Sequence, residues 1–180
     1  TQDYSVQLDA APDENFQFDE AGNLTDWTKA DGTVVKYGWD AANRLREVRV
    51  NGSLEREFLY DGAGRMVRAK TSSVWDDYSW DGMERLRREQ YNSSDQSVIQ
   101  TRRYLTHGFT RSEGGNPANT YLVTRDHLGS TREVLDDAYN VVARYDYSPW
   151  GKVEKLSGTI DADQLYTGHL YFPHSETPLH

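Results

Sequence analysis

Residues 121–151, YLVTRDHLGSTREVLDDAYNVVARYDYSPWG, limit what this chain can be more than any other stretch. Their β-branched and aromatic residues come in short runs, and each run ends in a cluster of Asp, Asn, Gly or Pro. Such runs are typical of β-strands joined by tight turns. The stretch is therefore predicted to form two β-hairpins, with turns at 126–129 and 136–140 and an end at 149–151.

A seven-residue motif recurs upstream of this stretch, as FDEAGNL, WDAANRL, YDGAGRM and WDGMERL. Successive copies begin 21, 21 and 20 residues apart, and such a constant period indicates a repeat architecture. Each copy has an aromatic residue, an Asp, two variable residues, a turn residue, a polar residue and an aliphatic one. The signature residues of the repeat are Phe18, Asp19, Gly22, Trp39, Asp40, Asn43, Tyr60, Asp61, Gly64, Trp80 and Asp81.

The motif itself is predicted to be a turn. Its Asp can cap the turn through the side chain, and its fifth position holds Gly22, Asn43 and Gly64, residue types that tolerate a positive φ. Glu84 occupies this position in the fourth copy. Either Glu84 is strained and Glu84→Gly stabilises the protein, or the fourth turn differs from the others.

A second turn lies halfway through each period, at Asp31-Gly32, Asn51-Gly52, Ser72-Ser73 and 92–95. Asp-Gly and Asn-Gly between strands favour two-residue type I′ hairpins. The strands are then expected at 24–29, 33–39, 45–50, 54–60, 66–71, 74–80, 86–91 and 98–105, after a first strand at 4–8. The result is an antiparallel meander with negligible helix and about sixteen strands over the whole chain.

The order RDHLGSTREVLD followed by NVVARYDYSPWGKV resembles the core segment of the Rhs (YD-repeat) family, and the resemblance runs from about residue 16 to about residue 171. It implies an all-β fold, an antiparallel YD-repeat hairpin meander that forms part of a spiralling β-sheet shell. The core signature residues are Arg125, Asp126, His127, Leu128, Gly129, Ser130, Arg132, Asp136, Tyr145, Tyr147, Pro149 and Gly151.

The chain divides accordingly into five parts. We expect an N-terminal connection at 1–15, YD repeats at 16–105, a Gly-rich loop at 106–120, a core-like segment at 121–171 and a tail at 172–180.

Composition excludes several classes of protein. A net charge of -9 with no basic stripe argues against nucleic-acid binding. The absence of Cys excludes disulfides, thiolate metal sites and cysteine nucleophiles. No apolar run approaches the roughly 20 residues that span a bilayer, so membrane insertion is not expected. The first residues do not form a signal peptide, which suggests an internal start, and the family resemblance implies a secreted or cell-surface protein.

Candidate sites of chemistry are weak. Asp126, His127 and Ser130 lie within one turn, too close in sequence to form a Ser-His-Asp relay, so a capping Asp and a packed His are expected. Two groups of possible metal ligands also lack a complete ligand pattern, and no metal or cofactor is predicted. Those groups are Asp9, Asp13 and Asn15, and His169, His174 and His180. The family carries aspartyl self-cleavage in Asp-Pro segments, and no Asp here precedes Pro, so we expect no enzyme.

Two functions remain, from different classes of protein. The resemblance to Rhs-type and Tc-type toxins implies a structural segment of a shell around a C-terminal effector. The resemblance to wall-associated and teneurin-like proteins implies instead an adhesive β-scaffold for carbohydrate or protein. Expected partners are further repeats, an enclosed effector and other copies that pair through open sheet edges. A processing protease is the weakest alternative.

Overall fold

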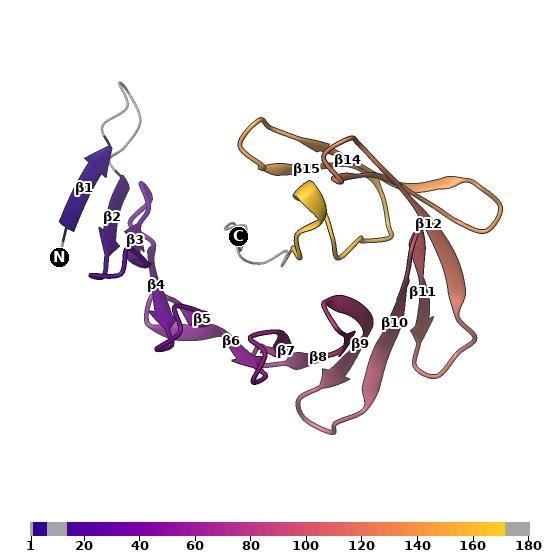
Figure 1. Cartoon of the computed structure of the whole chain (residues 1–180), viewed down its shortest axis with the longest axis horizontal. Coiled ribbons are helices and arrows are strands. Elements are labelled where there is room, and N and C mark those ends of the chain that lie inside the picture. Colours follow the sequence, from indigo (N-terminus) through magenta and orange to yellow (C-terminus); the bar gives the residue numbers. More distant parts are fainter. Residues whose placement is uncertain (1, 7–13, 172–180) are drawn as a thin grey trace. The chain divides into compact units, whose positions relative to one another are not determined.

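The computed structural model describes residues 2–6 and 14–171 and confirms an all-β, antiparallel fold (Figure 1). Its strands are β1 (Gln2–Val6), β2 (Glu14–Phe18), β3 (Leu24–Thr28), β4 (Val34–Trp39), β5 (Leu45–Val50), β6 (Ser53–Tyr60), β7 (Met66–Lys70), β8 (Val74–Asp81), β9 (Glu84–Asn92), β10 (Val98–Leu105), β11 (Gly108–Glu113), β12 (Asn119–Arg125), β13 (Thr131–Leu135), β14 (Val141–Tyr147) and β15 (Val153–Gly158). The one helical element of the described residues is a 3₁₀ turn, η1 (Tyr166–Gly168). Neighbours in the sheet are always neighbours in the sequence, as expected for a meander.

The chain forms two compact units. Residues 1–84 with 88–99 make up the N-terminal unit, and residues 85–87 with 100–180 make up the C-terminal unit. The N-terminal unit contains the first three motif copies and residues 80–84 of the fourth, and the C-terminal unit contains the core-like segment.

A five-residue loop closes the hairpin at the first three motif copies. In residues 61–65, Asp61 N–H donates to the Arg65 carbonyl at 2.9 Å and Gly64 N–H to the Asp61 carbonyl at 3.0 Å. Asp61 Oδ1 also accepts the N–H groups of Ala63 and Arg65, at 2.9 and 3.0 Å. The carboxylate thus satisfies loop donors that the strand ladder leaves unpaired. We call this arrangement the Asp loop.

The Asp loop occurs five times, and the two later copies lie in the core-like segment. It spans residues 19–23, 40–44, 61–65, 126–130 and 136–140. The two carboxylate bonds measure 2.8–3.0 Å in all five copies. Residues 148–152 repeat the backbone pattern with Ser148 in place of Asp. One local structure therefore builds both the repeats and the core-like segment.

The fourth residue of each loop has the left-handed conformation, which confirms the prediction for Gly22, Asn43 and Gly64, with φ of 85°, 57° and 81°. A β-bulge accompanies each Asp loop, because the strand that follows the loop has one extra residue just after it begins. The turn and the strand register are therefore set together.

The fourth motif copy is a different turn. β8 continues through Asp81 and β9 begins at Glu84, so a two-residue connection replaces the five-residue loop. The positive φ falls on Gly82, at 54°, and not on Glu84. Of the two alternatives, the different turn is confirmed and the strain at Glu84 is wrong, so Glu84→Gly is no longer expected to stabilise.

The second turns are of several kinds. Asn51 and Gly52 both have a positive φ, 49° and 84°, which confirms a type I′ hairpin. The type I′ prediction for Asp31-Gly32 is wrong. There Lys29 N–H bonds the Thr33 carbonyl and only Gly32 has a positive φ, so the loop has five residues and resembles the Asp loop in its backbone.

Aromatic side chains join each hairpin to the one before it. The residue that precedes a loop donates to the carbonyl that follows the previous Asp loop: Trp39 Nε1 to Leu24 at 2.7 Å, and Tyr60 Oη to Leu45 at 2.7 Å. Trp80 Nε1 bonds Met66 in the same way at 2.9 Å. This recurring bond explains why the three later motif copies open on Trp or Tyr.

The two faces of the N-terminal unit differ in chemistry. One face carries buried residues such as Tyr37, Val48 and Phe58. The other carries ion pairs, among them Lys36–Asp26 at 2.6 Å and Arg68–Asp77 at 2.5 Å. Strand alternation separates the two sets.

The boundary at 106–120 needs correction. The segment expected to be a Gly-rich loop contains β11 and the start of β12. The turn is confined to the residues around Gly114 and Gly115, which have φ of 54° and 80°. Phe109 and Arg111 alternate with the smaller polar residues Thr110 and Ser112 on β11. The glycines on both sides of this short run favoured the prediction of a loop over that of a strand.

Two glycines of one loop test the turn chemistry. Gly64 has φ of 81°, whereas Gly62 has no positive φ and open space around its Cβ position. Gly64→Ala is expected to lower the free energy of unfolding by about 1 kcal/mol. Gly62→Ala is the matched control and should be neutral or slightly stabilising. Equal effects in chemical denaturation would contradict the assignment of φ.

The capping carboxylates predict loss of stability in acid. Side-chain hydrogen bonds from Arg44 and Arg65 hold the pKa of Asp40 and Asp61 below the ordinary value. A lowered folded pKa stabilises the protein above the unfolded value, near pH 4, and the effect disappears as pH falls through the lowered value. The urea concentration at the unfolding midpoint should decrease when the pH is lowered below about 4. Asp61→Asn should weaken this pH dependence. Asp137→Asn, at an exposed loop position, should not weaken it.

Candidate functional site

The C-terminal unit includes a segment that follows β15 and packs back against the sheet. After β15 the chain turns back, and residues 159–171, including η1, lie against strands β10 to β14 (Figure 1). We call residues 159–171 the docked segment. Its Ala162 and Leu165 join a buried core with Phe109, Val134 and Tyr145.

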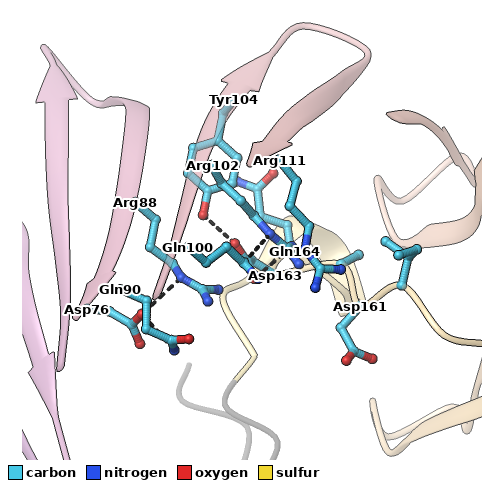
Figure 2. A network of polar contacts seen from close by, with 12 residues as sticks. Asp76, Arg88, Gln90, Gln100, Arg102, Tyr104, Arg111, Asp161, Asp163 and Gln164 are labelled. Atoms are coloured by element: carbon cyan, nitrogen blue, oxygen red, sulfur yellow. Dashed lines mark hydrogen bonds and ion pairs between the residues drawn. The ribbon is translucent and has the colours of Figure 1, made fainter. Parts of the chain in front are cut away.

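An ion pair fixes the middle of the docked segment. Arg102 Nη1 bonds Asp163 Oδ1 at 3.0 Å, and Tyr104 Oη bonds Asp163 Oδ2 at 2.5 Å (Figure 2). Arg102 and Asp163 are only 3% and 8% exposed. Arg102 also donates through Nε to Gln100 Oε1 at 3.1 Å and lies over the Phe109 ring. A buried charge needs such complete pairing, so this network specifies the position of the segment.

Two hydroxyls of the core-like segment hold the backbone of the docked segment. Thr131 Oγ1 donates to the Gln164 carbonyl at 2.7 Å, and Ser130 Oγ accepts the Thr167 N–H at 3.0 Å. The Thr131 N–H bonds the Leu165 carbonyl at 3.2 Å. Ser130 and Thr131 are almost completely buried, so their hydroxyls are used for structure.

The tyrosines of β14 make similar contacts. Tyr145 Oη accepts the Ala162 N–H at 3.1 Å and donates to the Ile160 carbonyl at 3.3 Å. Burial raises the pKa of Tyr145 to about 12, so the hydroxyl stays neutral and can donate. Tyr147 donates to the Thr131 carbonyl, the same bond that joins hairpins in the repeats, and burial raises its pKa too.

The 148–152 loop packs on η1. Tyr166 Oη donates to the Pro149 carbonyl at 3.3 Å, and the Tyr166 ring lies against Tyr147. A Cβ at Gly151 would come within 2.9 Å of the Tyr166 ring, and Gly151 has φ of 84°. Gly151 is therefore required by both the backbone and the close approach.

The structure brings together part of the predicted core signature. Ser130, Tyr145, Tyr147, Pro149 and Gly151 all contact the docked segment or bond beside it.

The other signature residues lie elsewhere. Asp126 and Asp136 cap their own loops. Arg132 pairs with Asp146 at 3.0 Å, and Arg125 donates to the Thr106 carbonyl. His127 and Leu128 are exposed, so the expectation of a packed His is wrong.

No catalytic relay forms around Ser130. Asp126 Oδ1 accepts the N–H groups of Leu128 and Ser130, and the Ser130 hydroxyl accepts Thr167 N–H. His127 is exposed in the same loop. The three residues have structural roles that explain their positions.

Sequence reasoning missed Arg102, Tyr104, Thr131 and Asp163. Gln100, Arg102 and Tyr104 alternate along β10, which predicts a common face, but nothing in the sequence links that face to an Asp about sixty residues later.

The N-terminal unit has its own buried polar cluster. Asp76 pairs with Arg88 at 3.0 Å and accepts the Gln90 amide at 3.2 Å (Figure 2). Arg56 is buried nearby, and burial lowers its pKa while Asp76 opposes the shift. Arginine remains a cation even so.

A pocket of ≈ 380 Å³ opens in the C-terminal unit beside the docked segment. Arg111, Glu113 and Asn119 line it together with Tyr121 and Ile160. Arg111 pairs with Glu113.

The part of the chain with assigned structure holds no cluster of three or more His, Asp or Glu side chains suited to a metal. Asp9, Asp13, His174 and His180 lie outside the described residues. Asn15 is in β2, and His169 Nδ1 contacts Thr167 Oγ1 at 2.6 Å. None of the helical residues described forms a segment long and apolar enough to cross a membrane.

Comparison with known proteins confirms the Rhs/YD-repeat resemblance. The family described as RHS Repeat matches residues 18–54. The chain is 25% identical over 178 residues to double-stranded DNA deaminase toxin A of Burkholderia cenocepacia, covering 83% of this chain and 12% of that protein. It is 26% identical over 170 residues to tRNA nuclease WapA of Bacillus subtilis, covering 92% of this chain and 7% of that one.

Solved structures share the fold. The TcdB2-TccC3 crystal structure superposes with a TM-score of 0.54 at 18% identity, over 76% of this chain and 9% of its own. The Photorhabdus luminescens Tc holotoxin pore gives 0.53 at 15% identity, over 93% of this chain and 12% of its own. The chain thus spans about a tenth of the length of each similar protein.

The buried ion pair yields a stability prediction. Asp163→Leu leaves Arg102 charged, buried and without its carboxylate, and should cost about 3 kcal/mol in the free energy of unfolding. Adding Arg102→Met should recover much of that loss. Asp161→Ala is the control, because the Lys155–Asp161 pair is exposed and should contribute less than about 1 kcal/mol. Additive losses in the double variant would contradict the network.

Proposed function

We propose that this chain is a non-enzymatic structural segment of a toxin-type Rhs protein, part of a β-shell that encloses or presents a C-terminal effector. The observation that carries the proposal is that the polar and aromatic side chains of the motifs form hydrogen bonds within the fold itself. Loop carboxylates bond their own loops, and motif aromatics bond the preceding hairpin. Such self-directed bonding supports a building element rather than a site of chemistry.

The similar proteins support the proposal by their size and their names. Two are named as a DNA deaminase toxin and a tRNA nuclease, and this chain corresponds to only 12% and 7% of them. Those activities are then carried outside the matched region. By analogy, the effector that this segment would serve lies in another part of a longer chain, and the whole protein would be secreted or displayed at the cell surface.

The docked segment supports a role in leading the chain toward such an effector. A buried ion pair and two buried hydroxyls hold residues 162–167. This firm attachment fixes the path of the chain as it leaves the sheet. Further repeats would pair with the outer edges of β1 and β15, which each have one sheet neighbour among the described strands.

An adhesive scaffold is the second candidate. Exposed aromatic side chains favour it, because Tyr139 and Trp150 are 73% and 90% exposed and could stack on a sugar. A glycan array with the purified chain separates the candidates: specific binding that Trp150→Ala abolishes supports adhesion.

Cysteine labelling tests the shell, because the chain has no native Cys. In the intact full-length protein, Leu59→Cys on the ion-pair face should react with both small and polymer-linked maleimides. Val50→Cys, paired with buried Val35 on the other face, should react with the small reagent and resist the large one. Equal reaction of both variants with the large reagent would contradict enclosure.

A further inference from the structure

The pocket of ≈ 380 Å³ in the C-terminal unit lies between the β11–β12 hairpin and the start of the docked segment. Arg111 of β11 pairs with Asn119 of β12 in the sheet, so both side chains leave the same face. Tyr121 follows Asn119 on this face, and Ile160 comes from the docked segment. The volume falls in the range of about 300–1,000 Å³ that is usual for small-molecule sites. We call this hollow the hairpin pocket.

The polar side chains of the hairpin pocket are not used by the fold. Within residues 2–6 and 14–171, the side chains of Asn116, Asn119 and Thr159 form no hydrogen bond, whereas the loop carboxylates bond their own loops. Arg111 Nε is buried without an acceptor among the same residues, and Arg111 Nη2 bonds Glu113. Polar groups that converge on a hollow without partners in the protein are suited to partners in a ligand.

The walls of the hairpin pocket are fixed by the packing around it. The Tyr121 ring stacks on Phe109, with the ring centroids 5.2 Å apart, and Ile160 packs against the same core. The Asn116 N–H donates to the Glu113 carbonyl at 2.9 Å and so closes the turn of the hairpin. A ligand can therefore bind with little loss of conformational freedom in the protein.

The lining indicates a neutral ligand with several hydroxyl groups. Arg111 and Glu113 are the charged side chains of the lining, and they form an ion pair with each other. An anion would be repelled by the Glu113 carboxylate, which is 58% exposed, and a cation by the Arg111 guanidinium. A guanidinium only donates, a carboxylate only accepts, and amides and hydroxyls do both. Sugar hydroxyls match this set because each can donate and accept, while Tyr121 and Ile160 supply an apolar wall for the ring.

We propose that the hairpin pocket is a binding site for a neutral saccharide of one or two rings, whose hydroxyl groups Arg111, Glu113 and Asn119 hold. The site goes beyond the proposed shell and does not depend on it, because every lining residue belongs to the C-terminal unit. It also differs from a sugar site at Trp150 or Tyr139, because neither of these residues lines the pocket.

Nuclear magnetic resonance of the isotope-labelled chain tests the proposal, with N-acetylglucosamine and galactose as probes. The side-chain amide signals of Asn116 and Asn119 should shift and saturate with at least one of the two sugars, with a dissociation constant on the order of 1 mM. Asn119→Ala should weaken binding at least roughly fivefold, because it removes a hydrogen-bonding group. Thr120→Ala is the matched control, an exposed neighbour whose side chain leaves the opposite face, and should leave binding unchanged.

Glu113→Gln tests the argument from charge. The substitution keeps the size of the side chain but removes the carboxylate beside Arg111, so inorganic phosphate should bind this variant and not the wild type. Trp150→Ala should leave saccharide binding unchanged, which separates the hairpin pocket from the exposed aromatic side chains of the adhesive candidate. Thermal melts of all variants should match the wild type, since the substituted side chains are exposed.

Three outcomes would overturn the proposal. Pocket signals that shift with neither sugar show that the hairpin pocket is not a saccharide site. Shifts of the wild-type signals with phosphate show an anion site instead. Saccharide binding that persists in Asn119→Ala and is lost in Trp150→Ala shows that the sugar binds to the exposed aromatic side chains.

Discussion

The structure depends on one interaction, the acceptance of loop N–H groups by an Asp carboxylate. A five-residue hairpin loop turns several backbone donors away from the strand ladder, and an unpaired donor is costly. Asp61 Oδ1 satisfies two of these donors at once. The loop then needs a left-handed fourth residue and places a bulge beside it, which fixes how the two strands pair. Consequently the preceding aromatic residue meets the carbonyl that follows the previous loop.

The two units use this interaction to different ends. In the N-terminal unit it is repeated with little change, and aromatic side chains form hydrogen bonds between successive hairpins. In the C-terminal unit it supports a surface on which residues 159–171 lie, and the equivalent aromatic, Tyr147, bonds the Thr131 carbonyl below them. The buried pair of Arg102 and Asp163 adds specificity there, because a charged side chain in that position tolerates few alternative registers.

Local patterns of the sequence predicted local structure well. The motif period predicted the strands, and residue type predicted the positive φ of Gly22, Asn43 and Gly64. The equivalent loop at 136–140 was harder, because Tyr139 takes the left-handed position, with φ of 63°, that glycine or asparagine usually fills. The docking of Asp163 against Arg102 was beyond such reasoning. It depends on a contact between residues far apart in sequence, and no periodic pattern encodes that distance.

The last residue of each repeat loop also links that loop to the next one. Asn23 reaches Asn43 at 3.0 Å, Arg44 reaches the Asp61 carbonyl at 3.4 Å, and Arg65 reaches the Gly82 carbonyl at 2.6 Å. These three links run from an earlier donor to a later acceptor, whereas the aromatic bonds of Trp39, Tyr60 and Trp80 run from a later donor to an earlier acceptor. Neighbouring repeats are therefore linked in both directions, and a hairpin that emerges during synthesis meets a donor in the previous loop while its own aromatic side chain supplies a donor in return.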